Sequence, residues 1–189
     1  MKRLVIVFTA LSIVLTTSVN AQSKKINADA SSIEWTGKKI GGAHDGNIQL
    51  KSGSLEMKNG NITGGEFVVD MTSITNNDLK DPDYNGKLVG HLKSADFFNV
   101  EEYPTATLKI KSAEAFSSKG TAKVTGVFTI KGISKEITFD ASKADGGYAA
   151  TINIDRSEFD VRYGSKTFFS NIGDKAIDDI FTLDVKLAM

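Results

Sequence analysis

The stretch 127–140, VFTIKGISKEITFD, contains two short runs in which apolar and polar residues alternate, with Lys131-Gly132 between them. Alternation with a period of two places one face of a strand against an apolar interior and the other face in water. A short glycine-containing break between two such runs is typical of a hairpin turn. The stretch therefore predicts two antiparallel strands joined by a tight turn.

The same alternation recurs along most of the chain. Clear runs and weaker candidates together predict these further strands: Ser32–Thr36, Gly46–Leu50, Ser54–Met57, Gly65–Met71, Thr107–Lys111, Thr151–Asp155 and Thr182–Leu187. Asn59-Gly60 and Asp145-Gly146-Gly147 supply further turn signals. Many short strands at regular spacing favour a sandwich or a barrel, and a barrel leaves no exposed sheet edge. We therefore predict an all-β domain, an antiparallel barrel of about eight strands.

One segment does not alternate, and the two prolines of the chain, Pro82 and Pro104, bracket it. Asp81 is a good N-cap, and proline is well tolerated at the first position of a helix. Four residues then follow the i, i+3, i+4, i+7 spacing of one helical face: Leu88, His91, Leu92 and Ala95. The segment predicts one short helix near residues 82–95 that lies over an end or a flank of the barrel.

Residues 1–21 have the pattern of a secretory signal peptide. Two basic residues precede an apolar run, Leu4–Val14, and Val19 and Ala21 occupy the positions that a signal peptidase reads. The apolar run is shorter than the about 20 residues that a membrane-spanning helix needs. We therefore expect cleavage after Ala21, a periplasmic or secreted location, and one domain over residues 22–189 with no transmembrane segment.

The mature domain is close to neutral. Loss of Lys2 and Arg3 with the signal peptide reduces the 23 basic residues to 21, against 23 acidic ones. This balance gives no electrostatic support for binding to nucleic acid or to an anionic membrane surface. The chain has no cysteine, which excludes disulfides, thiolate metal sites and a lipid-anchored lipoprotein.

Catalytic and metal-binding motifs are weak. The chain lacks the G-x-S-x-G turn of many hydrolases, although His44 or His91 could still act as a base in a hydrolase or isomerase through contacts made in the fold. Asp81–Gly86 matches the first half of a calcium-binding EF-hand loop, but Leu92 stands where the bidentate glutamate is needed. Helix capping explains these acids more economically. We therefore expect no enzyme activity, no metal and no cofactor.

The barrel interior is the remaining candidate site. Barrels of about eight strands either fill their interior with side chains or hold one apolar ligand. Eleven phenylalanines and one tryptophan, with many aliphatic residues, suit either outcome. A filled barrel would act as a structural or stress-response interaction protein. A hollow one would bind a lipid tail, because each buried methylene contributes about 0.8 kcal/mol.

Several motifs follow one another along the chain: Trp35–Gly37 with Gly42–Gly46, Phe67–Ile74, His91–Phe98 with Tyr103–Thr107, Val124–Lys135 and Asp155–Phe159. Together they resemble the YceI-like family of exported bacterial polyisoprenoid-binding proteins. The resemblance implies a lipocalin-like barrel with its helix between the fourth and fifth strands. It also implies a carrier, not an enzyme, whose apolar channel holds an amphiphilic isoprenoid lipid such as a polyprenyl phosphate or a ubiquinone-like quinone. A homodimer is compatible with the sequence.

The resemblance also directs attention to particular side chains. Seven are candidates for the channel wall or its plug: Trp35, Phe67, Leu92, Phe97, Phe98, Phe128 and Phe159. His44 and His91 are candidates for polar contacts near a lipid head group. The alternative for both histidines is a structural hydrogen bond that holds a loop or the helix in place.

Two further features concern charge and the channel mouth. Arg156 could pair with Asp155, with Asp160 or with a ligand phosphate, and an ion pair within the protein is the commoner outcome. Tyr163–Lys175, which contains Phe168-Phe169, is longer and more aromatic than the family pattern. We expect this segment to reshape or cap one mouth of the channel.

Overall fold

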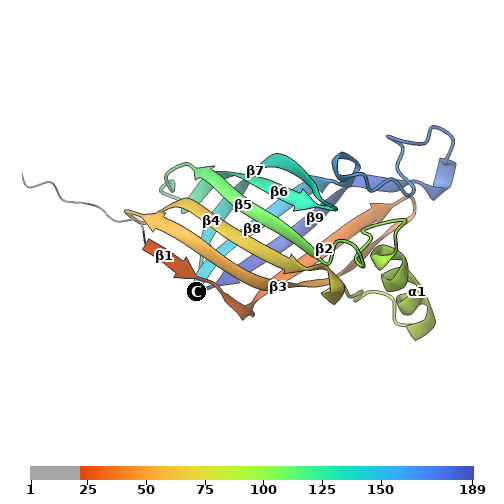
Figure 1. The fold of residues 1–189 in the computed structure, drawn as a ribbon, viewed down its shortest axis with the longest axis horizontal. Helices are drawn as coiled ribbons and strands as arrows, with labels where there is room; N and C mark the ends of the chain where they lie inside the picture. Colours follow the sequence, from red (N-terminus) through yellow and green to blue (C-terminus); the bar gives the residue numbers. More distant parts are fainter. Residues whose placement is uncertain (1–21) are drawn as a thin grey trace, which may run out of the picture.

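The structure is a computed structural model that describes residues 22–189 (Figure 1). The expected signal peptide, residues 1–21, lies outside the described residues. The strands run in chain order: β1 (Gln22–Lys25), β2 (Asn27–Lys39), β3 (Gly42–Lys58), β4 (Asn61–Asp70), β5 (Thr105–Ala113), β6 (Thr121–Ile130), β7 (Ile133–Ala144), β8 (Gly147–Asp155) and β9 (Ile177–Ala188). One α-helix and three short 3-10 helices join them: α1 (Pro82–Lys93), η1 (Met71–Ser73), η2 (Arg156–Phe159) and η3 (Gly173–Lys175).

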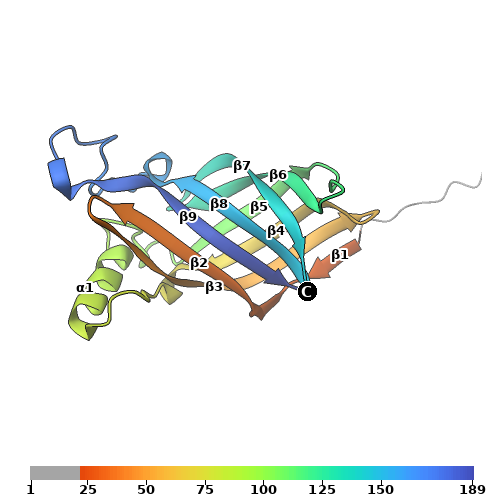
Figure 2. The same ribbon diagram turned by 180° about the vertical axis from the view of Figure 1, so that it is seen from behind.

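The strands close into an antiparallel barrel (Figures 1 and 2). The sheet order is β1-β3-β2-β9-β8-β7-β6-β5-β4, and β4 also pairs with β3, which joins the two sides of the sheet. β1 and β2 pair with successive parts of β3, so they share one place in the wall and the barrel has eight places in all. The predicted all-β antiparallel barrel of about eight strands is confirmed.

Hairpin turns lie where the sequence predicted them. Asn59-Gly60 joins β3 to β4 and Lys131-Gly132 joins β6 to β7, and all four residues have φ between 50° and 77°. Positive φ at both central residues matches the twist of the flanking strands. β3 is one long strand, although the sequence suggested two. A β-bulge near Leu50–Ser52 shifts its register against β4, so the alternation is interrupted while the strand continues.

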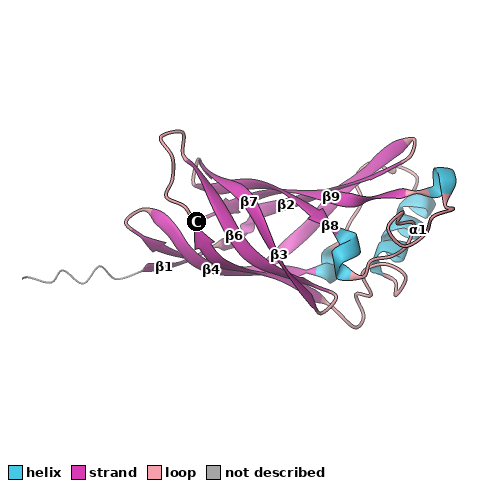
Figure 3. Cartoon of the chain, turned by 90° about the horizontal axis from the view of Figure 1, so that it is seen from above, coloured by secondary structure: helices cyan, strands magenta, loops and turns pink. Residues whose placement is uncertain are grey.

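The predicted helix follows β4 in the chain and lies at one end of the barrel (Figures 1 and 3). The Asp81 side chain accepts hydrogen bonds from two backbone N–H groups of the first turn, as expected for an N-cap. The helix ends at Lys93, earlier than predicted, because Ser94 adopts extended backbone angles (φ −68°, ψ 168°). Ala95 is consequently exposed rather than part of a packed face. Within residues 22–189, no helix has the length and apolar character needed to cross a membrane.

One strand pairing in the wall is incomplete. β7 and β8 pair only from Ala141↔Ala150 to Ala144↔Gly147, next to the hairpin that joins them. Towards the other end the two strands separate, and η2 packs against β7 and β9. Phe159 and Val161 are fully buried in and after η2. Apolar packing by this segment therefore takes the place of the missing strand contacts.

Candidate functional site

Two cavities lie inside the barrel. The inward-facing positions of the strands are apolar, as the alternation predicted. The larger cavity, about 130 Å³, reaches the α1 end, where Leu92, Phe97 and Phe98 line it. The smaller cavity, about 80 Å³, lies towards the opposite end and is lined there by Leu55 and Tyr148. The interior is thus hollow over part of its length and is not completely filled by side chains.

Five side chains line both cavities: Ile33, Val69, Leu108, Phe128 and Leu183. They come from β2, β4, β5, β6 and β9, and we call them the five-residue ring. Val69, Leu108 and Leu183 face inward and yet are only partly buried, because they border the hollow. The two cavities therefore adjoin at the ring, and we call them together the channel.

Aromatic side chains close the channel at the α1 end. Phe97 and Phe98 pack edge to face with their ring centres 5.0 Å apart, and Phe98 packs in the same way on Phe181 of β9 at 6.3 Å. All three line the larger cavity, beside Leu92 of α1. We call Phe97, Phe98 and Phe181 the aromatic lid, since they pack together where the larger cavity reaches the α1 end.

Arg156, at the start of η2, brings a buried charge to the wall of the larger cavity. Its side chain is 2% exposed, and its guanidinium lies 5.4 Å from the centre of the Phe97 ring. The guanidinium donates to four backbone carbonyls: Nε to Asp178 (3.0 Å), Nη1 to Val161 and Tyr163 (2.9 Å each) and Nη2 to Ile177 (3.1 Å). Arg156 therefore joins the segment after η2 to the start of β9.

Asp179 supplies the charge opposite Arg156. Its Oδ1 lies 3.2 Å from Nη2 of Arg156, an ion contact that is not aligned as a hydrogen bond, and its Oδ2 accepts a hydrogen bond from the Thr167 hydroxyl (2.8 Å). Burial would raise the pKa of Asp179, but hydrogen bonds from Ser165 and Thr167 and the charge of Arg156 hold it below its ordinary value. Burial lowers the pKa of Arg156, and neighbouring carboxylates oppose that shift.

The ion partner of Arg156 differs from the two aspartates that the sequence suggested. Asp155 instead accepts hydrogen bonds from the backbone N–H and the hydroxyl of Ser157 and so caps η2. Asp160 pairs with Arg162 at the surface. Both aspartates are close to Arg156 in the chain, but the turn of η2 directs their carboxylates to nearer donors.

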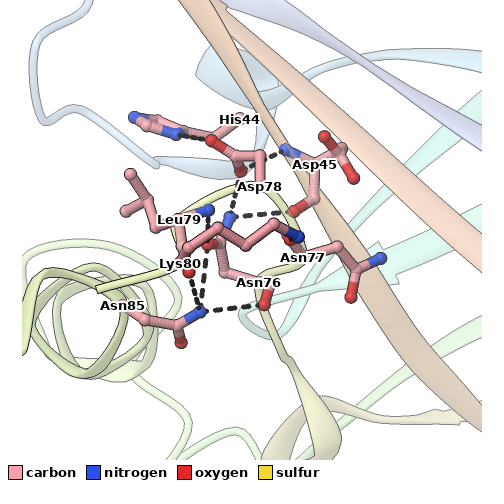
Figure 4. A network of polar contacts seen from close by, with 8 residues as sticks. All are labelled: His44, Asp45, Asn76, Asn77, Asp78, Leu79, Lys80 and Asn85. Carbon is pink, nitrogen blue, oxygen red and sulfur yellow. Dashed lines mark hydrogen bonds and ion pairs between the residues drawn. The ribbon is translucent and has the colours of Figure 1, made fainter. Parts of the chain in front are cut away.

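His44 takes part in a polar network between β3 and the loop before α1 (Figure 4). Its Nδ1 lies 2.8 Å from Oδ2 of Asp78, whose Oδ1 accepts from the backbone N–H of Asp45 (3.1 Å). Asn76 is buried and donates to the Asp45 carbonyl (2.8 Å) and to the Asp78 carboxylate. Burial would raise the pKa of Asp78, but the bonds from His44, Asn76 and Asp45 lower it to about 2. Asn85 extends the network to α1 by donating to two carbonyls of the loop.

The same loop approaches β3 most closely at Gly46. The backbone N–H of Thr75 donates to the Asn47 carbonyl (3.0 Å), and the Trp35 indole donates to the Thr75 carbonyl (3.0 Å). A Cβ on Gly46 would lie 1.9 Å from that carbonyl oxygen and 2.8 Å from the Trp35 ring. Only glycine permits this approach. Trp35 thus lines the channel with its ring and holds the loop with its N–H.

His91, in α1, contacts two aromatic rings. Its ring packs edge to face on Tyr163 at 4.3 Å and on Phe97 at 5.7 Å. Its Nε2 is buried and has no hydrogen-bond partner among residues 22–189. Neither His91 nor His44 lines either cavity. Residues 22–189 also contain no cluster of three or more side chains that could hold a metal ion.

The sequence model of the YceI-like domain matches residues 25–189. The chain belongs to the YceI-like family. Curated relatives include a UPF0312 protein of Ectopseudomonas mendocina, 33% identical over 81 residues, which cover 38% of this chain and 42% of the relative. A UPF0312 protein of Pseudomonas aeruginosa is 39% identical over 66 residues, covering 32% of this chain and 34% of the relative. The aligned part thus spans less than half the length of these relatives.

Solved structures share the YceI-like barrel. BcnA from Burkholderia cenocepacia has a TM-score of 0.67 at 21% identity, covering 86% of this chain and 98% of that one. A polyisoprenoid binding domain from Saccharophagus degradans, implicated in plant cell wall breakdown, has a TM-score of 0.59 at 13% identity, covering 89% and 97%. The YceI protein of Campylobacter jejuni has a TM-score of 0.51 at 20% identity, covering 100% and 98%. At these identities the likeness shows a common fold.

Most of the predicted site residues border the YceI-like channel. The larger cavity includes six of them: Trp35, Leu92, Phe97, Phe98, Phe128 and Arg156. Phe67 lines the smaller cavity. His44, His91 and Phe159 line neither. Phe159 is fully buried but lines neither cavity, because it belongs to η2, which packs against β7 and β9.

The aromatic segment Tyr163–Lys175 does not plug the YceI-like channel. Phe168 and Phe169 are 38% and 48% exposed, and neither lines a cavity. The guanidinium of Arg162 lies 5.0 Å from the Phe168 ring centre, on the surface. The segment contributes to the channel end through the Tyr163 carbonyl, which accepts from Arg156, and through its ring against His91.

The aliphatic part of the channel wall was not among the predicted site residues. Ile33, Val69, Leu108 and Leu183 of the five-residue ring were not singled out, although they line both cavities. Leu108 and Leu183 stand at inward positions of two predicted strands, so the alternation contained the signal. These aliphatic residues were overlooked because aromatic side chains were preferred as candidates for the channel wall.

Proposed function

We propose that this protein is an exported carrier, periplasmic or secreted, that binds an isoprenoid lipid by enclosing its chain in the channel. The observation that supports this most strongly is the pair of apolar cavities that adjoin at the five-residue ring. A similar barrel from Saccharophagus degradans is described as a polyisoprenoid binding domain. Binding is favoured over hydrolysis because neither histidine borders the channel.

The energetics of such a site favour a long unbranched or methyl-branched chain. Each buried methylene contributes about 0.8 kcal/mol, so several isoprene units contribute on the order of 10 kcal/mol before the cost of association. The wall offers apolar contacts along its length and few hydrogen-bonding groups. The chain's fit to the channel, rather than any single polar contact, would set the affinity.

Narrowing the ring tests this proposal. Val69→Phe places a larger side chain at the point where the two cavities meet, whereas Val68→Phe changes the neighbouring residue of β4, which faces the other side of the strand. Trp35 is the single tryptophan and lines the channel, so its quenching reports binding of a quinone with a long isoprenoid tail.

We expect saturable quenching in the delipidated natural protein and in Val68→Phe, with affinity at least about tenfold weaker in Val69→Phe. Circular dichroism and urea unfolding serve as controls that each variant is folded. Absence of saturable quenching in the natural protein would contradict the proposal. Equal affinity in the two variants would show that the chain does not pass the ring.

A further inference from the structure

We infer that the lipid carries an uncharged head group, such as a quinone or an alcohol, and not a phosphate. This inference rests on the proposed function and concerns the chemistry at the channel mouth. It depends on where the channel reaches solvent, on the donors available there, and on the charge that surrounds them.

We place the mouth beside Asp178, at the start of β9. Among the residues that line the two cavities, Asp178 is the exposed one, and it borders the larger cavity together with Ile177 and Gly37. The smaller cavity is lined by buried and partly buried side chains without a charge among them. A head group that remains in contact with water therefore lies near Asp178, with its chain extending towards the five-residue ring.

Arg156 is a buried cation beside this mouth, and its donors are already occupied. An arginine side chain has five N–H groups. Four donate to the carbonyls of Val161, Tyr163, Ile177 and Asp178 at 2.9–3.1 Å, and Nη2 also faces Asp179 Oδ1 at 3.2 Å. A phosphate could reach these donors only by displacing a buried carbonyl or the carboxylate, and the displaced group would be left buried without its partner, which disfavours phosphate binding.

Among the side chains that the structure describes, carboxylates outnumber cations around Arg156. The carboxylates of Asp155, Asp178 and Asp179 act on the single guanidinium of Arg156. In the strand register, Lys39 lies opposite Ile177, but Lys39 is exposed, so salt and water weaken its effect. A phosphate at the mouth would meet an excess of like charge, whereas a carbonyl or hydroxyl group would not.

A competition experiment separates the two head-group classes. The reference is quenching of Trp35 by a long-tailed quinone, and the competitors are a polyprenol and a polyprenyl phosphate with the same chain. We expect the polyprenol to displace the quinone at least about tenfold more effectively than the phosphate, with a smaller difference at high salt. The identical chains ensure that the head group alone accounts for the difference.

Asp178→Asn provides the matched variant. Asparagine can still accept the hydrogen bond that Asp178 Oδ1 receives from the Ile180 N–H, so the local backbone is retained. The ratio of phosphate affinity to polyprenol affinity should rise severalfold in Asp178→Asn. It should not change in Asp184→Asn, which removes an exposed carboxylate farther along β9.

The outcomes are distinguishable. Phosphate binding as tight as polyprenol binding in the natural protein would overturn the inference and leave the proposed function intact. An unchanged ratio in Asp178→Asn would overturn the electrostatic reason for it. If neither the quinone, the polyprenol nor the phosphate binds, the proposed function fails, and this inference fails with it.

Discussion

The two ends of the barrel are closed by different interactions. At the α1 end, directional polar contacts hold the segments around the aromatic lid: Arg156 donates to four carbonyls, and Asp78 accepts from His44 and its neighbours. The chain there is held by specific partners, several of them in loops. At the opposite end the Phe116 N–H donates to Asn61 Oδ1 (3.0 Å) and the Ala188 N–H donates to the Ser31 hydroxyl (3.0 Å), and apolar side chains pack between the strands.

The apolar side chains at that opposite end are deeply buried. Leu55 and Ile26 are only 1% and 2% exposed. Tyr148 stacks on Phe116 with ring centres 5.7 Å apart and an angle of 17° between the planes. The Tyr148 hydroxyl has a weak partner, the Met57 sulfur at 3.9 Å.

The difference indicates which end can open. Apolar packing depends on the buried area of the whole core, so loosening that end requires extensive unfolding. Polar contacts of a loop and a helix can break locally while the strands remain paired. We therefore expect lipid to enter at the α1 end, past the aromatic lid, and the opposite end to remain closed.

The largest effect is expected at Arg156. Arg156→Met leaves four carbonyls and the Asp179 carboxylate without their partner, which should destabilise the fold by about 3–5 kcal/mol. Arg162→Met removes an exposed arginine and its surface pair with Asp160, at a cost below about 1 kcal/mol. Urea unfolding of both variants measures the contrast. Similar losses would mean that the buried arginine does not hold the α1 end.

Gly46 should have the next largest effect. A Cβ there collides with the Thr75 carbonyl, so Gly46→Ala should displace the loop and cost about 2–3 kcal/mol. Gly42→Ala, at the start of the same strand, meets nothing within 4 Å and should remain within about 0.5 kcal/mol of the natural protein. Thermal unfolding compares them. A tolerated Gly46→Ala would show that the loop does not need this close approach.

The lowered pKa of Asp78, at the α1 end, predicts that the free energy of unfolding decreases at low pH. Its pKa is lowered in the folded state from 3.8 to about 2, so its contribution is present above about pH 4 and is lost as the pH falls towards 2. The loss should be on the order of 1–2 kcal/mol, since the side chain is partly exposed. The difference in unfolding free energy between the natural protein and Asp78→Asn, measured from pH 5 to pH 2, should therefore shrink. A constant difference would contradict the assignment.

The smallest effect is expected at the packed end. Tyr148→Phe removes a hydroxyl whose partner is a thioether at 3.9 Å, and it retains the ring that stacks on Phe116. The change in unfolding free energy should stay below about 0.5 kcal/mol, because a thioether is a weak acceptor and its hydrogen bond with the buried hydroxyl stabilises the fold only slightly. A loss above about 1 kcal/mol would mean that polar contacts matter at this end too.

The sequence predicted the barrel better than it predicted the site. Alternation in stretches such as 127–140 depends only on neighbouring residues, and the hairpin turns and the Asp81 cap are local as well. The contacts of the α1 end are not local: His44 and Asp78 lie 34 residues apart in sequence, and Arg156 and Ile177 lie 21 apart. No pattern within one segment indicates such partners.

The sequence predicted only part of what defines the channel. Alternation determined which side chains face inward, but whether inward side chains fill a barrel depends on its diameter and on the strand separation. Phe159 illustrates the limit. Its aromatic ring was predicted to line the channel wall, but the residue lies in η2 and its ring is buried away from the cavities. Trp35 illustrates the converse, since one side chain both lines the channel and holds a distant loop.

The central claim, that the channel holds an isoprenoid lipid, is tested most directly by native mass spectrometry of the protein purified under mild conditions from the organism that encodes it. We predict a mass increment that corresponds to one bound lipid, lost on solvent extraction, with an isoprenoid of uncharged head group in the extract. Protein that carries no lipid, or an extract that contains no isoprenoid, would contradict the claim.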